Sequence, residues 1–498
     1  MTLIILTLLL LPLSFFFLHR RRSPENKNSS AGSLSELLKN THRILDWTTD
    51  LLAGSPTSTI TTFMATITSN PSNVEHILKS NFPNYPKGSH STTILSDLLG
   101  AGIFNSDGEL WRLQRKTASL EFTTKTIRSF IFSNVHLEIS RLLSVLHSFS
   151  ISGEVFDLQE LLDRLAFDNV CQVTFGHDPG RLDSSSEHID SAAFAHAFER
   201  ATVLSVRRFA HPFSITWKLL RFFNLSYEKE LKAQVSKVHA FAMQVVHRRK
   251  SSGELGDDLL SRFISESSSY SDEFLRDIIV SFVLAGRDTT SATLTWFFYL
   301  ISIHPEVKTK LLDELRAVRA RGAREGELTV EQVKELNYMH AALSETLRLY
   351  PPVPLQTRAC AESDEWPDGT KVKKGRTVMY SAYAMGRSER IWGRDWEEFR
   401  PERWMEEGEF RVVNAFRFPV FHAGPRMCLG KEMAYVQMKT VVAAVMERFE
   451  IEVVGGEKEK EEEEKKREVE FTMILRMKGG LPVRVRRKTM MMDGTVEL

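Results

Sequence analysis

A ten-residue stretch near the carboxyl end constrains this chain more than any other feature of its sequence. The stretch, FHAGPRMCLG (421–430), places one aromatic, one cationic and one thiol side chain at fixed offsets among glycines. Its thiol, Cys428, is one of three cysteines; the other two, Cys171 and Cys360, lack comparable surroundings. So few thiols, without a CxxC pair, exclude a disulfide scaffold and a cysteine-rich zinc site. We therefore expect Cys428 to act as a single metal ligand or nucleophile.

The residues around Cys428 suit a thiolate that binds iron. Such a thiolate needs backbone N–H groups aimed at its sulfur, because they stabilise the negative charge. Gly424 and Gly430 allow close backbone approach and positive φ angles. Arg426 can neutralise a porphyrin carboxylate, and Phe421 can shield the sulfur from water. These residue types favour a haem-thiolate site with Cys428 as the axial ligand.

With this loop, the chain resembles the plant cytochrome P450 monooxygenases over about residues 35–490. The resemblance implies a mainly α fold with smaller β-sheets (α+β), a haem b cofactor and O2-dependent hydroxylation. It also implies that electrons come from NADPH through a separate P450 reductase. A hydrophobic content of 42% agrees with a globular chain that has a substantial core. The net charge of +1 provides no overall field for binding nucleic acid.

A long helix is predicted from Asp272 to Ile301, with Ser271 as its N-cap. It contains the sequence AGRDTT, which resembles the oxygen-activation motif of the family. The resemblance implies that Thr289, backed by the Asp288 carboxylate, relays protons during oxygen activation. It further implies that Gly286 leaves room above the haem.

A second helix is predicted from Val330 to Tyr350, where Glu345 and Arg348 share one face. The later sequence FRPERW resembles a family loop whose arginine, here Arg403, joins this pair in a buried network. The implied role of the three residues is structural, because they hold the cysteine loop in register. An exposed pair would contribute little to stability, so burial decides the importance of this network.

Further basic residues resemble the family's haem-carboxylate partners. Trp111 and Arg115 match its WxxxR helix, which implies that both side chains meet a haem propionate. Arg358 aligns with an additional propionate-binding cation of some relatives. Without the cysteine loop, the WxxxR pattern fits an ordinary amphipathic stripe equally well.

The amino-terminal segment predicts a membrane anchor. Residues 1–18 are apolar and uncharged, which is near the short end of a transmembrane helix, and HRRR follows directly. Positive charge after the anchor predicts that the rest of the chain is cytosolic, and the resemblance implies the endoplasmic reticulum membrane. A cleaved signal peptide is less well supported, because a basic n-region is missing. We expect a basic and polar linker at 19–34 and one catalytic domain at 35–498.

Two further patterns complete the predicted organisation. Short β runs are expected between Lys371 and Tyr383 and again between Phe471 and Arg486. Every residue from Glu457 to Glu468 is charged, which favours a solvated loop or helix face over a partner-binding tail.

Three stretches, which begin at Asn84, Trp366 and Val420, resemble one plant branch of the family. That branch contains ω-hydroxylases of fatty acids and hydroxylases of jasmonoyl-isoleucine. Both substrates are small amphipathic acids oxidised near the apolar end, so we expect an apolar channel with a polar or cationic mouth. The leading hypothesis is fatty-acid ω-hydroxylation, and the alternative is 12-hydroxylation of jasmonoyl-isoleucine.

Two hypotheses from other classes remain. A haem-thiolate hydroperoxide lyase or allene-oxide synthase needs neither O2 nor a reductase, but such enzymes typically lack the helix threonine and have an altered cysteine loop. A haem-binding membrane scaffold would need no proton relay. The presence of Thr289 and the regular spacing of the cysteine loop count against both.

Overall fold

The computed structural model describes residues 34–123, 125–182, 189–211, 214–253, 255–267, 270–321, 327–454 and 467–488. The expected anchor (1–18), nearly all of the linker (19–34) and most of the charged run (457–468) lie outside the described residues. Within the described parts of the chain, no helix is both long and apolar enough to cross a membrane.

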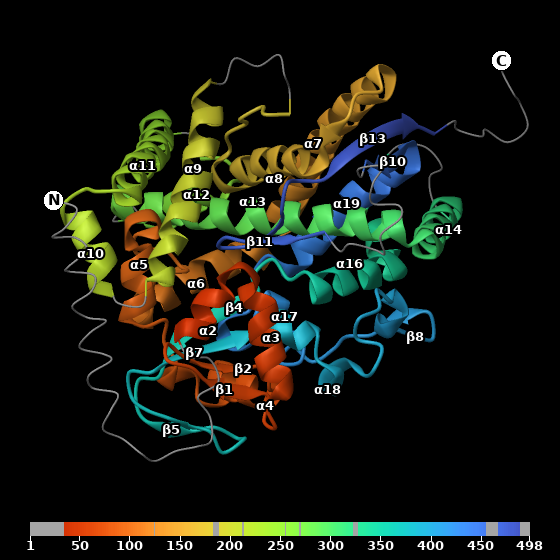
Figure 1. The fold of residues 1–498 in the computed structure, drawn as a ribbon. Coiled ribbons are helices and arrows are strands. Elements are labelled where there is room, and N and C mark those ends of the chain that lie inside the picture. The colour runs from red at the N-terminus through yellow and green to blue at the C-terminus, as the bar shows by residue number, and fades with distance from the viewer. Residues whose placement is uncertain are drawn as a thin grey trace, which may run out of the picture.

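Helices dominate the fold and the small sheets lie at separate places around them (Figure 1), as expected for the mainly α class. Apart from the long central helix and the two helices within residues 330–349, the α-helices are α2 (Leu34–Lys39), α3 (Ile44–Gly54), α4 (Pro71–Glu75), α5 (Ser89–Leu99), α6 (Gly108–Thr123), α7 (Lys125–Ser152), α8 (Leu158–Phe175), α9 (Ile189–Arg207), α10 (Ser214–Phe222), α11 (Tyr227–Ser252), α12 (Leu259–Glu266), α14 (Pro305–Arg321), α17 (Ala382–Gly386), α18 (Glu389–Trp392) and α19 (Lys431–Arg448).

Helix α13 (Asp272–Ile303) crosses the middle of the molecule (Figure 1). The Ser271 hydroxyl caps it by accepting the Phe274 N–H at 3.2 Å, so the predicted helix and its cap are confirmed. The helix ends where His304 precedes Pro305, because a residue before proline disfavours helical angles. One half of α13 packs in an apolar cluster with α8, α9 and α11, and the other half in a cluster with α14 and α19. The helix is therefore the shared centre of both cores.

The second predicted helix is broken in two, so the prediction of one helix from Val330 to Tyr350 is wrong. The structure has α15 (Val330–Glu335) and α16 (Asn337–Leu349), separated by Leu336. The Lys439 ammonium on α19 donates to the Leu336 carbonyl at 3.1 Å. The Glu314 carboxylate accepts the first N–H groups of α16 at 2.6 and 2.9 Å. These distant side chains satisfy the backbone groups that the break exposes.

The main sheet has the strand order β1 (Thr59–Thr61), β2 (Thr66–Thr68), β7 (Thr377–Ser381) and β4 (Leu355–Ala359). Strand β2 runs parallel to β7, with Ile67 opposite Met379, and the other two pairings are antiparallel. A second sheet joins β10 (Phe449–Val453), β13 (Pro482–Arg487) and β3 (Phe156–Asp157). Smaller pairs are β5 (Asp364–Glu365) with β6 (Lys371–Val372), β8 (Met405–Glu406) with β9 (Glu409–Phe410), and β11 (Val469–Phe471) with β12 (Leu475–Met477). Both predicted β regions are therefore present.

Candidate active site

The cysteine loop (421–430) leads directly into α19, and a hydrogen bond within its own backbone closes it. The Cys428 N–H donates to the Phe421 carbonyl at 2.8 Å. Gly424 has a φ of 65°, and a Cβ there would lie 2.1 Å from the Leu78 carbonyl oxygen, so this position requires glycine. Gly430 has a φ of −87°, so it does not use the positive φ that glycine allows.

The Cys428 sulfur lies close to a backbone donor and two cations. Its side chain remains accessible, although protein surrounds it on most sides. Burial raises the pKa of the Cys428 thiol, whereas the Gly430 N–H and the charges of Arg115 and Lys431 lower it. These groups favour the thiolate once a metal ion replaces the thiol proton.

Basic residues from four separate segments gather near this loop. Arg426 lies 4.3 Å from the centre of the Trp111 ring and donates to Asp107 at 2.6 Å. Arg358, on β4, is only 1% exposed. Burial lowers the pKa of the Lys87 amine, and the nearby charges of Arg358 and Arg426 lower it further. The structure thus brings the predicted residues Trp111, Arg358 and Arg426 together.

Arg115 belongs to the same cluster. Burial lowers its pKa, and the Cys428 thiolate opposes this shift. The Arg115 charge also lowers the pKa of Arg426, which burial brings to about 10. Arg115, the cation of the WxxxR pattern, is therefore close to both the Cys428 sulfur and the Arg426 guanidinium group.

The cluster has more donors than protein acceptors. The buried Nε atoms of Arg358 and Arg426 have no hydrogen-bond partner within the described residues. In the described part of the chain, Asp107 is the carboxylate that faces these two arginines. Buried donors normally find acceptors, so the two unpaired Nε atoms fit a ligand that carries carboxylates.

Two members of this cluster, Lys87 and Asp107, were not predicted from the sequence. Asp107 precedes α6 and looks like an ordinary N-cap, but its side chain instead accepts the Lys87 backbone N–H at 3.0 Å. Nothing in the local sequence distinguishes Lys87 from a surface lysine.

The predicted network of Glu345, Arg348 and Arg403 is present, and its central pair is completely buried. Glu345 accepts from Arg348 at 2.7 and 2.8 Å and from Arg403 at 3.2 Å. The Trp404 indole adds a bond at 2.8 Å and the Arg400 N–H one at 3.0 Å, neither of which was predicted. The network therefore fastens α16 to the loop that precedes the cysteine loop.

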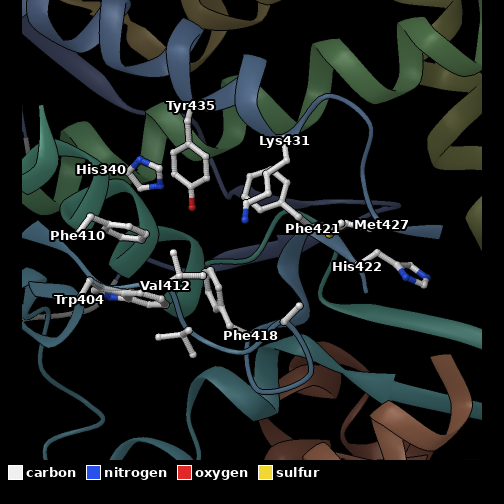
Figure 2. A pocket seen from close by; sticks show the side chains of 12 residues that line it. His340, Trp404, Phe410, Val412, Phe418, Phe421, His422, Met427, Lys431 and Tyr435 are labelled. Carbon is white, nitrogen blue, oxygen red and sulfur yellow. The ribbon is translucent and has the colours of Figure 1, made fainter. Parts of the chain in front are cut away.

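Aromatic side chains support the cysteine loop from one side. They line a pocket (Figure 2) in which the His340 ring stacks on Tyr435 at 3.8 Å and lies 4.0 Å from Phe410. Phe421 contacts Tyr435 at 5.3 Å between ring centres. The pocket is lined by His340, Trp404, Phe410, Val412, Val413, Ala415, Phe418, Phe421, His422, Met427, Lys431 and Tyr435. Thr289 and Asp288, the catalytic candidates on α13, do not line this pocket. The pocket therefore belongs to the residues that support the cysteine loop.

The two catalytic candidates of α13 are not joined to each other. The Thr289 hydroxyl donates to the Ala285 carbonyl at 2.6 Å. The Asp288 carboxylate is buried and lies 3.4 Å from the Arg287 Nε. Burial raises the pKa of Asp288, and Arg287 opposes this shift. No hydrogen bond between Asp288 and Thr289 occurs in the described structure.

Gly286 faces a neighbouring helix, not open space, so the expected role of leaving room above a cofactor is wrong. A Cβ at this position would lie 2.4 Å from Cγ2 of Val170 on α8. The glycine is therefore needed for the close packing of α8 against α13.

We expect Gly286→Ala to destabilise the fold by about 1–3 kcal/mol, because the added methyl group overpacks this contact. Chemical unfolding would measure the loss. In a Val170→Ala background the same substitution should cost much less, since the clash is removed. Equal losses in both backgrounds would contradict the packing explanation.

The comparison with protein families decides the identity of this fold. Residues 37–478 match the family model described as Cytochrome P450. The chain belongs to the cytochrome P450 family. P450 enzymes are monooxygenases, and the cysteine loop described above lies within the matched residues.

Three plant P450 enzymes show how similar the chain is to known relatives. The chain is 60% identical over 476 residues to Cytochrome P450 CYP94D108 of Paris polyphylla, which covers 94% of each chain. It is 44% identical to Cytochrome P450 94B1 of Arabidopsis thaliana, over 94% of this chain and 92% of the relative. Cytochrome P450 94A1 of Vicia sativa is 43% identical, over 92% of this chain and 89% of the relative. The protein is thus a plant P450 that is similar to members of family 94.

Membership of the P450 family implies a haem b cofactor. The described residues fit this group, because an accessible thiol backed by a backbone N–H lies near buried arginines whose Nε atoms lack a partner in the described structure. The Cys428 sulfur can therefore bind the iron of a porphyrin, and the arginines can pair with its two carboxylates.

Proposed function

We propose that this P450 hydroxylates the terminal carbon of fatty acids, with O2 and with electrons supplied by NADPH through a P450 reductase. The similarity to family 94 over about nine-tenths of the chain carries this proposal. The sequence resemblance to ω-hydroxylases of the same plant branch supplies the substrate class.

The cysteine loop and the basic residues around it would hold the haem. The Cys428 thiolate binds the haem iron, Phe421 shields the sulfur, and Gly424 and Gly430 shape the loop around it. The cofactor carboxylates pair with Arg426, Arg115 and Arg358 and contact Trp111. The network of Glu345, Arg348 and Arg403 keeps this loop in register.

When bound, the haem supplies the activation of oxygen, and Thr289 controls proton delivery. Its oxygen can accept a hydrogen bond from water while its own proton bonds to the Ala285 carbonyl at 2.6 Å. Rotation of the hydroxyl would then pass a proton on. Asp288 directly precedes Thr289 in α13, and its buried carboxylate is not bonded to the Thr289 hydroxyl. Water must therefore link the two groups if Asp288 supplies protons to Thr289.

We expect Thr289→Ala to uncouple the enzyme, with product per NADPH falling about tenfold and peroxide rising, because a general acid is lost. Product, NADPH and peroxide would be measured together. Thr293→Ala is the matched control, since Thr293 makes the same bond to the carbonyl four residues earlier at 2.7 Å. Unchanged coupling in Thr289→Ala would contradict the relay.

Incubation with reductase and NADPH tests the substrate directly. A panel of saturated and unsaturated fatty acids and jasmonoyl-isoleucine would be supplied separately, and products identified by mass spectrometry. We expect ω-hydroxy acids that require NADPH. Oxidation of jasmonoyl-isoleucine alone would instead favour the alternative function, 12-hydroxylation of jasmonoyl-isoleucine. Conversion of a fatty-acid hydroperoxide without reductase would favour the lyase or dehydratase class.

We further propose that residues 1–18 anchor the enzyme in the endoplasmic reticulum membrane with the catalytic domain in the cytosol. The uncharged run followed by HRRR supports this orientation. Deletion of residues 1–22 should move most of the protein from the membrane pellet to the supernatant after centrifugation. Complete retention of the shortened protein in the pellet would contradict anchoring by this segment.

A further inference from the structure

His422, in the cysteine loop, has a backbone conformation that suits glycine. Its φ is 63° and its ψ is −175°, a region that side chains with a Cβ rarely occupy. Strain of this kind persists only where the surrounding structure enforces it, and it points to a role for the side chain.

The His422 imidazole connects the cysteine loop to Arg358. Its Nε2 lies within hydrogen-bond distance of the Arg358 Nη2. Because a guanidinium group can only donate, Nε2 must accept this bond. The Nδ1 atom then carries the ring proton and donates it to the Ala423 carbonyl at 2.9 Å, so the Ala423 N–H, 2.8 Å from Nδ1, does not donate to the ring in this tautomer. Burial lowers the pKa of His422 well below its usual value, and the Arg358 charge lowers it further, so the ring is neutral.

The same contacts fix the direction of the Arg358 side chain. Arg358 donates from Nη1 to the Thr357 carbonyl at 2.6 Å and from Nη2 to His422. Its third nitrogen, Nε, is buried and has no partner in the described structure. His422 lies away from His340 and Tyr435 in Figure 2, at the other end of the loop's aromatic support.

We propose that His422 is a positioning residue that holds the Arg358 guanidinium toward a carboxylate of the haem. This inference rests on the proposed role of Arg358, but not on the proposed substrate. Since the cysteine loop contains both His422 and Cys428, His422 links the binding of the cofactor carboxylate by Arg358 to the binding of the iron by Cys428.

Haem loss from the holoenzyme to excess apomyoglobin tests this proposal without any activity measurement. We expect His422→Gly to lose haem roughly tenfold faster than the wild type, as for other residues that orient a cofactor ligand. Its reduction potential should shift to more negative values, because a cation near the haem is less well held. His422→Gln, whose carbonyl can still accept from Arg358, should restore most of both properties.

Glu407→Gly is the matched control, because Glu407 also has a positive φ, 51°, but lies in the turn between β8 and β9. It should leave haem loss and potential unchanged. A purely structural role of His422 would predict that faster haem loss accompanies weaker folding. We instead expect the unfolding midpoint of His422→Gly to fall by no more than the weaker haem binding accounts for, because relief of backbone strain leaves the folding of the protein itself unimpaired.

Arg358→Lys separates the possible failures. If His422 acts through Arg358, combining both substitutions should add nothing to the haem loss of Arg358→Lys alone. Fast loss in Arg358→Lys with wild-type loss in His422→Gly would overturn the role of His422 only. Wild-type loss in Arg358→Lys would overturn both this proposal and the carboxylate-binding role of Arg358.

Discussion

Cys428→Ala is expected to abolish hydroxylation and to remove most of the bound haem. The substitution deletes the sulfur that lies among the Gly430 N–H, Arg115 and Lys431, and alanine supplies no electron pair for the iron. The basic cluster alone would then have to retain the cofactor. Haem content per polypeptide and product formation in the presence of reductase would measure the effect.

Cys171→Ala provides the matched control. Cys171 is completely buried in the apolar cluster around α8, so its loss should reduce stability modestly and leave haem content unchanged. Circular dichroism would establish that Cys428→Ala is folded. Wild-type haem content and activity in a folded Cys428→Ala protein would refute Cys428 as the ligand.

Glu345→Gln is expected to destabilise the fold by about 3–5 kcal/mol, because the buried Arg348 loses the charge that compensates it and Arg403 keeps only Asp395. Glu345 and Arg348 are both 0% exposed, so water cannot replace the missing carboxylate. Arg348 remains held by the carbonyls of Trp396 at 2.8 Å and Glu398 at 3.0 Å, which do not neutralise it. Denaturant unfolding with haem content measured in parallel would show the loss.

The ion pair of Asp313 and Arg316 offers a control with the same three-residue spacing. It is exposed on α14 at 2.9 Å, so Asp313→Asn should change stability by less than about 1 kcal/mol. A similarly small effect of Glu345→Gln would show that burial does not give the network its importance.

Features that depend on local sequence were predictable. The start of α13 was predicted because Ser271 is a good N-cap before an acidic first turn. The buried network was predicted because its three residues match a family pattern, and Gly424 because its loop requires an unusual turn. In each case neighbouring residues or a recognised motif carry the information.

Features that depend on distant contacts were missed. The break at Leu336 is stabilised by Lys439, which lies 103 residues away in the chain. Gly286 packs against Val170 of another helix, so its spacing within the motif could not reveal its partner. The ring of His422 meets Arg358 across 64 residues. Such roles appear only once tertiary packing brings the segments together.

The absorption spectrum of the reduced wild-type enzyme with carbon monoxide tests the central claim most directly. Thiolate ligation by Cys428 requires the long-wavelength Soret band that distinguishes sulfur from imidazole opposite carbon monoxide. We expect this band in the wild type and its disappearance in Cys428→Ala. A band at the position of imidazole-ligated haem in freshly purified, active enzyme would contradict the assignment of the cysteine loop.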